Sequence, residues 1–84
     1  MRFLKTYDGI FVNVNSIETL SIQNKYLEEY GVVCVCATLL RNAGAEEPRF
    51  LQLSEYFSVE DGEKMLDRII KELTQSADEV VKCY

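Results

Sequence analysis

The run from Tyr30 to Leu40, YGVVCVCATLL, constrains the fold most, because it is apolar at both odd and even positions. Successive side chains of a β-strand point to opposite faces of the sheet. A strand with two apolar faces must therefore be covered on both sides, which is typical of the central strand of a sheet. The sequence predicts that the rest of the chain pairs with this strand or covers it.

Shorter strand-like segments surround the central strand. Asp8-Gly9 lies between two apolar runs and predicts a β-hairpin with a two-residue turn. The buried parity then changes between Ile17 and Leu20, which predicts a bulge or a sharp bend near residues 18–19. Short connections favour antiparallel neighbours. The expected sheet is a meander of four to five strands, with the bounds 2–7, 10–14, 17–23, 30–40 and 49–57.

The last part of the chain has the period of a helix. Ser58 is the expected N-cap, and acids follow it at the positive end of the helix dipole. Apolar residues then recur at spacings of three and four, namely Leu66, Ile69, Ile70 and Leu73. The sequence predicts a helix over 59–76 that packs on one face of the sheet. Eighty-four residues suffice for one domain, so we expect a single α+β domain over 1–84.

One helix covers only one face of a sheet, so the second apolar face of the central strand requires another layer. If a second copy packs on this uncovered face or on an exposed edge, the protein is a homodimer. Alternatively, the face lines a pocket of a small-molecule-binding protein or minor enzyme. Rapid modification of the native thiols would indicate the pocket, and protection would indicate a packed face. The candidate interface residues are Val32, Cys34, Cys36, Phe11, Phe50 and Tyr56.

Residues suited to catalysis or metal binding are sparse. The chain has no histidine, which removes the commonest general base and the usual partner of a nucleophilic serine or cysteine. Cys34 and Cys36 lie about 7 Å apart between Cα atoms if the strand is regular, which disfavours a mutual disulfide and lacks the turn of a zinc knuckle. We interpret both as small buried apolar residues. No spacing brings together the strand-borne carboxylates Asp8, Glu18 and Glu55. We therefore expect that the protein is not an enzyme and that it has neither a cofactor nor a metal site.

The charge pattern bears on the class of partner. The net charge is −5, and the excess of acids lies in residues 55–79. Affinity for nucleic acid or an anionic membrane depends on clustered Lys and Arg, whereas the nine in this chain are scattered. We therefore expect neither partner. An odd number of cysteines, three, favours reduced thiols. Since no signal peptide or membrane span is visible, we expect a cytoplasmic protein.

Two segments carry a resemblance, FVNVNSIETL from Phe11 to Leu20 and FSVEDGEKML from Phe57 to Leu66. Together they resemble the plan of small, functionally unassigned bacterial and phage proteins, in which a meander leads to a phenylalanine, a Ser or Thr cap, two acids and an amphipathic C-terminal helix. The chain departs from that plan at Gly62, where alanine is common, and in its longer central strand. The resemblance implies a fold and a bacterial or phage source, and no activity. The expected function is a non-enzymatic module for self-association or protein–protein interaction.

Overall fold

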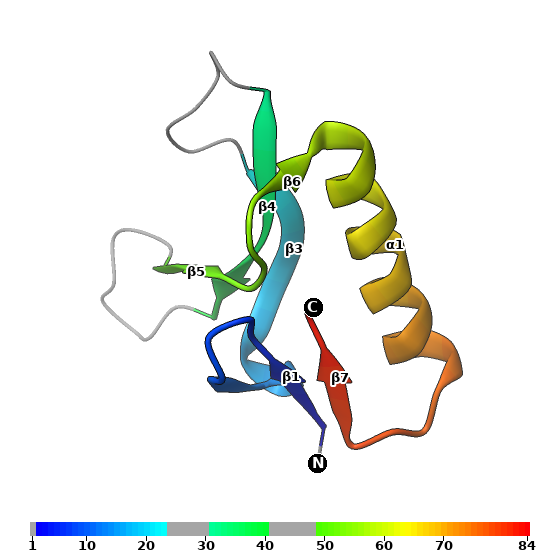
Figure 1. Ribbon diagram of the computed structural model, residues 1–84. Helices are drawn as coiled ribbons and strands as arrows, with labels where there is room; N and C mark the ends of the chain where they lie inside the picture. The colour runs from blue at the N-terminus through cyan, green and yellow to red at the C-terminus, as the bar shows by residue number, and fades with distance from the viewer. Residues whose placement is uncertain (1, 24–30, 41–48) are drawn as a thin grey trace.

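The computed structural model describes residues 2–23, 31–40 and 49–84, and its fold is α+β, with antiparallel sheets and one C-terminal helix (Figure 1). Tyr30, the expected start of the central strand, lies outside the described residues, as do the predicted connections within 24–30 and 41–48. The elements are β1 (Phe3–Lys5), β2 (Phe11–Asn13), a turn of 3-10 helix (Val14–Ser16), β3 (Ile17–Gln23), β4 (Val32–Leu39), β5 (Arg49–Gln52), β6 (Phe57–Ser58), α1 (Val59–Gln75) and β7 (Val80–Lys82).

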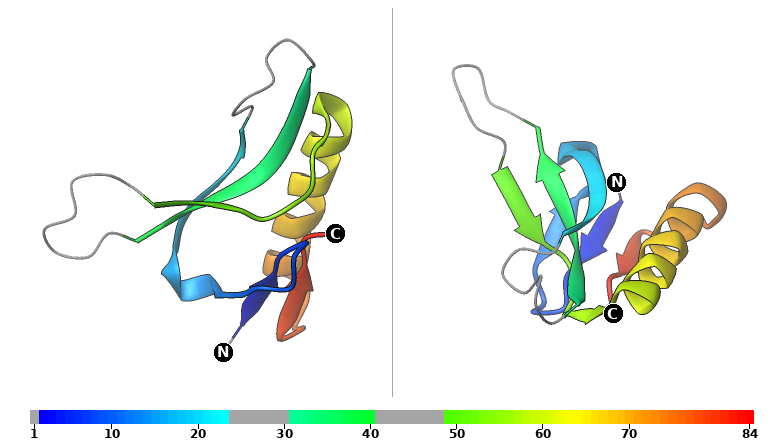
Figure 2. Two further views of the ribbon diagram at one scale, coloured as in Figure 1. Left: turned by 60° about the vertical axis from the view of Figure 1, so that its left-hand side comes forward. Right: turned by 90° about the horizontal axis from the view of Figure 1, so that it is seen from above.

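Strand β4 is central, as the sequence predicts. It pairs antiparallel with β3 along one edge and with β5 and β6 along the other. All six residues from Val33 to Thr38 are buried, which confirms that the strand is covered on both faces. Helix α1 lies along one side of β3 and β4 (Figure 2). Val35 and Ala37 point to that side and join Leu53 and Ile69 in the core.

Two irregularities interrupt the pairing with β4. The register shifts between Ile17 and Thr19, which confirms the predicted bulge. The strand expected over 49–57 is broken into β5 and β6, because residues 53–56 lie opposite only two residues of β4. Ser54 is fully buried in this break, and its hydroxyl accepts a hydrogen bond from the Val35 N–H at 2.9 Å. A side chain thus satisfies a buried backbone donor of the central strand at the break.

The hairpin at Asp8-Gly9 forms with a three-residue loop rather than the expected two-residue turn. The Thr6 N–H donates to the Ile10 carbonyl at 2.8 Å, and the Gly9 N–H donates to the Thr6 carbonyl at 3.1 Å. Gly9 has φ +88°, while Asp8 keeps a negative φ, which is the pattern of a turn closed by a glycine bulge. The Thr6 hydroxyl donates to the Asp8 carboxylate.

The expected single meander is divided into two sheets. The hairpin β1–β2 pairs with β7, a strand that the sequence did not predict, in the order β2-β1-β7. β7 runs parallel to β1 and places Val81 opposite Leu4. Both side chains are buried in the same core as Val35 and Ile69. The chain therefore leaves the first sheet after β2, builds the second around β4, and returns to the first after α1 (Figure 1).

Helix α1 begins where the sequence predicts and ends one residue earlier, at Gln75. The Ser58 hydroxyl accepts from the Asp61 N–H at 3.2 Å, which confirms the N-cap. Gly62 lies against β4, where a Cβ atom would come within 2.5 Å of Val33 Cγ2. Glycine therefore allows the helix to approach the sheet closely. Ile69 is fully buried, but Ile70 is exposed and does not belong to the buried stripe in which it was placed.

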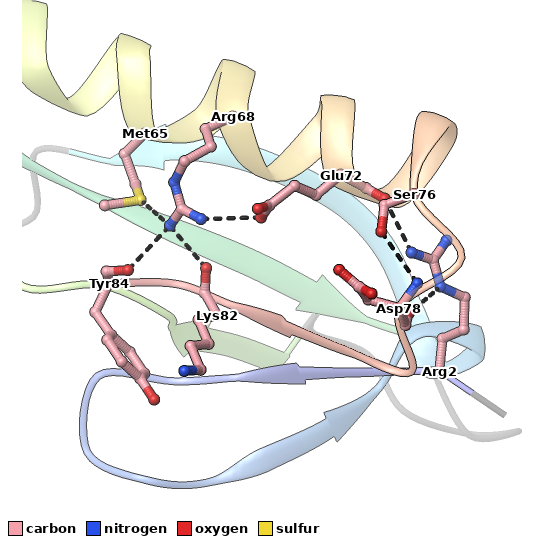
Figure 3. A network of polar contacts seen from close by, with 8 residues as sticks. All are labelled: Arg2, Met65, Arg68, Glu72, Ser76, Asp78, Lys82 and Tyr84. Carbon is pink, nitrogen blue, oxygen red and sulfur yellow. Dashed lines mark hydrogen bonds and ion pairs between the residues drawn. The ribbon is translucent and has the colours of Figure 1, made fainter.

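Arg2 links the first sheet to the end of the helix (Figure 3). Its guanidinium donates to the carbonyls of Glu72 at 2.9 Å and Asp78 at 3.0 Å, and also to the carbonyl of Leu73. The last turn of a helix leaves carbonyls without partners inside the helix, and a cation there also suits the dipole. Arg2 thus acts as a C-terminal cap supplied by the residue that precedes β1, distant in sequence from the helix.

Candidate association surfaces

The face of β4 that points away from α1 carries Cys34 and Cys36. In the register of the sheet they lie opposite Gln23 and Ser21 of β3. Their Sγ atoms are 3.4 Å apart, and the two side chains are 1% and 4% exposed. Cys34 and Cys36 are therefore buried within a single chain, as expected of small apolar residues. Both thiols contribute little exposed surface that a partner or ligand could contact.

The candidate interface residues do not share one surface. Phe50 lies opposite Thr38 on the same face of the sheet as the two thiols, and Val32 is half-buried at the start of β4. Tyr56 lies in the break between β5 and β6 and is exposed. Phe11 belongs to the other sheet, so its grouping with β4 was wrong. Strand parity cannot distinguish the two sheets, because it reports only the alternation of faces within one strand.

Strand β3 forms an outer edge of its sheet, since in the described part of the chain it pairs with β4 alone. It is seven residues long, and Glu18 and Thr19 are exposed. Edge strands present backbone groups that can pair with another chain, and natural proteins commonly protect them with lysine, proline or a covering element. β3 contains neither lysine nor proline, and Glu18 is its one charged residue. The irregularity between Ile17 and Thr19 and the charge of Glu18 protect the start of this edge, so the part of β3 that can accept a further strand is residues 19–23.

The outer edge of β7, by contrast, is occupied by Arg68 of α1 (Figure 3). The guanidinium donates to the carbonyls of Lys82 at 2.7 Å and Tyr84 at 3.2 Å. The other terminal nitrogen of the guanidinium, Nη1, forms an ion pair with Glu72 Oε2 at 2.9 Å. A charged side chain that binds edge carbonyls hinders the addition of another strand. The two sheets therefore differ in how their outer strands are protected.

The outer face of β2-β1-β7 combines aromatic rings with lysines. Leu4, Val12 and Val81 point into the core, so their neighbours along each strand point outward. Phe11 is 54% exposed, and its ring packs edge-on against Phe3 with 6.4 Å between centroids. We call this surface the aromatic–lysine face, and it consists of Phe3, Lys5, Phe11, Val80, Lys82 and Tyr84.

The lysines of this face lie close to its rings. Lys5 Nζ is 5.6 Å from the centroid of Phe11 and 5.9 Å from that of Tyr84, and Lys82 Nζ is 5.9 Å from that of Tyr84. These distances are within the range of cation–π attraction. This face was not predicted from the sequence, because β7 was not predicted. Val80, Lys82 and Tyr84 recur at every second position, and this period of two was the signal that could have revealed the strand.

The described residues offer little for catalysis. They contain no group of three or more His, Cys, Asp or Glu side chains placed to hold a metal ion. Burial raises the pKa of the Cys83 thiol to about 11, which the Arg68 charge opposes and the Glu72 charge reinforces. A thiol with such a pKa is a poor nucleophile near neutral pH. Across the described ranges, no helix is long and apolar enough to cross a membrane.

Comparison of the chain with protein-family models, with curated proteins and with solved structures finds no match. The resemblance to small bacterial and phage proteins therefore stays a prediction. The two surfaces that bear on function are the β3 edge and the aromatic–lysine face.

Proposed function

We propose that the protein is a non-enzymatic self-association module that forms a homodimer by pairing β3 of one copy with β3 of a second. The observation that carries this proposal is the long outer strand without a protecting lysine or proline. Addition of a strand to such an edge forms main-chain hydrogen bonds and continues the sheet. The dimer would hold one continuous sheet with β3 of each copy at its centre.

The sequence of β3 suits pairing with itself. Antiparallel pairing about a two-fold axis at Leu20 places Leu20 opposite Leu20 of the second copy. Thr19 then lies opposite Ser21, and Glu18 lies opposite Ile22. Cross-strand pairs of hydroxyl residues and of apolar residues are favourable, whereas like charges directly opposite are not. In this register Glu18 of one copy does not lie opposite Glu18 of the other.

The two faces of β3 would also continue correctly into the second copy. Leu20 and Ile22 lie opposite Ala37 and Val35 of β4, which point to the core side. Thr19 lies opposite Thr38, and their hydroxyls share a hydrogen bond on the other side. The proposed pairing therefore sets Leu20 beside Leu20 and the hydroxyls of Thr19 and Ser21 beside each other, while Glu18 lies beside Ile22. The small-molecule alternative lacks a comparable observation, because the thiols that would line its pocket are buried.

Sedimentation equilibrium over a hundredfold dilution tests the dimer. We expect the wild-type mass to rise towards that of two chains as the concentration increases. The double variant Thr19→Lys/Ser21→Lys should stay monomeric, because lysines of the two copies would lie opposite each other. An equimolar mixture with Thr19→Glu/Ser21→Glu should recover a heterodimer, since opposite charges then meet in the same register.

The matched control is Phe50→Ser, which changes an exposed residue of β5, at the other edge of the sheet, and should leave the dimer intact. Circular dichroism of each variant checks that the fold is retained. A wild-type protein that stays monomeric at every concentration would refute the proposal. A double-lysine variant that is folded and still dimeric would move the interface away from β3.

A further inference from the structure

We propose that the aromatic–lysine face binds an acidic segment of a partner protein, in which carboxylates alternate with aromatic or aliphatic side chains. This binding would use the outer face of β2-β1-β7 and would leave the β3 edge free. The inference thus goes beyond self-association and does not depend on it.

Large apolar groups are exposed on this one sheet face. Phe11, Val80 and Tyr84 are all exposed. Folded proteins seldom leave neighbouring aromatic rings open to water unless the surface is used. Aromatic residues are also enriched at protein interfaces, because a ring provides much contact area with few rotatable bonds. The face therefore has the composition of a contact surface.

The aromatic–lysine face carries the positive charges of two lysines. Lys5 and Lys82 lie opposite each other in the β1–β7 register, and their ammonium groups are near the rings. The ion pairs of the described residues join Lys64 with Glu60 and Arg68 with Glu72, and neither involves these two lysines. The chain as a whole carries −5, with its acids concentrated in 55–79. The face is thus a positive site on an acidic protein, which favours an anionic partner.

The possible classes of partner differ in how well they suit this face. A second copy bound face to face about a two-fold axis would bring lysines towards lysines, which is unfavourable. A nucleic acid strand would gain only two lysine contacts with phosphates and would meet the net negative charge of the protein. A peptide with spaced carboxylates can pair with both lysines while its apolar side chains cover the rings. The observations favour the acidic peptide.

Fluorescence anisotropy with a labelled synthetic peptide of alternating Glu with Phe or Leu tests this inference. We expect saturable binding that weakens with added salt. Lys5→Glu and Phe11→Ser should each weaken binding at least about tenfold, the loss expected of a central interface residue. A peptide with Lys in place of Glu should not bind, because its charge matches that of the face.

Two matched controls are available in the chain. Phe50→Ser removes a ring that is 54% exposed, as Phe11 is, but lies on β5. Lys64→Glu reverses an exposed lysine on α1. Both variants should bind the peptide as the wild type does. Equal losses in control and test variants, or no saturable binding, would overturn the proposal.

Two further measurements separate this inference from the alternatives. The variant Thr19→Glu/Ser21→Glu, designed to be monomeric, should bind the peptide with unchanged affinity, so failure of the dimer and failure of this site are distinguishable. A labelled oligo(dT) strand of equal length should bind much more weakly than the peptide. Tighter binding of oligo(dT), lost in Lys5→Glu, would assign the face to nucleic acid and refute the peptide.

Discussion

Replacement of Gly62 by alanine tests the close contact between α1 and β4. In an ordinary helix this change stabilises by up to about 1 kcal/mol, because glycine has more backbone freedom to lose. Here the new Cβ would lie 2.5 Å from Val33 Cγ2, well inside the usual separation of carbon atoms. Val33 is buried on the central strand, and its β-branched side chain is stiff. We therefore expect Gly62→Ala to destabilise the protein.

The magnitude follows from two opposing terms. Overpacking of a core costs about 1 to 3 kcal/mol, and the upper part of that range applies because neither contacting group has a flexible end. After the helix-propensity gain of about 1 kcal/mol, the expected net loss is about 1 to 2 kcal/mol. Val33→Ala removes the clashing methyl group, and the nearest remaining atoms, Val33 Cβ and Ile22 Cγ2, lie 3.9 Å from the new Cβ. In that background Gly62→Ala should stabilise by up to about 1 kcal/mol.

Urea unfolding followed by circular dichroism measures all four proteins of this double-mutant cycle. The expected coupling energy between the two sites is about 2 to 3 kcal/mol. The reasoning is refuted if Gly62→Ala stabilises the wild-type background, or if its effect is the same with valine and with alanine at position 33. Either result would mean that α1 can move away from β4 without cost.

Two other changes test the contacts described above. Arg2→Ala should lower the free energy of unfolding by about 2 kcal/mol and speed amide exchange at the end of α1, because helix carbonyls lose a charged donor. The control Arg49→Ala changes an exposed residue of β5 and should lower it by less than about 0.5 kcal/mol. Burial raises the pKa of Cys83 from 9.0 to about 11, so the folded state holds its proton where the unfolded state has lost it. Stability should therefore fall by up to about 3 kcal/mol as pH rises from 9 to 11. Part of this pH dependence should vanish in Cys83→Ala. Equal pH dependence in both proteins would contradict its assignment to the Cys83 thiol.

The features that the sequence predicts correctly are those with a local physical signal. The two apolar faces of β4 are visible as a run without alternation, and the Ser58 cap is visible as a hydroxyl followed by acids. The bulge after Ile17 is visible because one extra residue reverses which parity is buried. Each of these signals depends on residues within a few positions of one another.

The features that the sequence missed depend on distant segments or leave parity unchanged. In the break between β5 and β6, the two extra residues restore the same parity, so the alternation from Arg49 to Phe57 shows no sign of it. Strand β7 has three residues, and its place beside β1 is decided by the packing of Val81 and Leu4 at opposite ends of the chain. Without β7, the aromatic–lysine face could not be assembled from the pattern, and Phe11 was assigned to the wrong sheet.

The parallel pairing of β1 with β7 has a consequence for the biosynthesis of the protein. The two strands are separated by about 75 residues, which a ribosome adds in about 4 to 15 s at typical rates. During that interval β1 can pair with β2, but its other edge and the inward face of Leu4 lack the partner that covers them in the folded protein. Closing so long a loop is also slow relative to forming a hairpin or a helix. Strand β1, although made well before β7, is therefore completed only after β7 has been made.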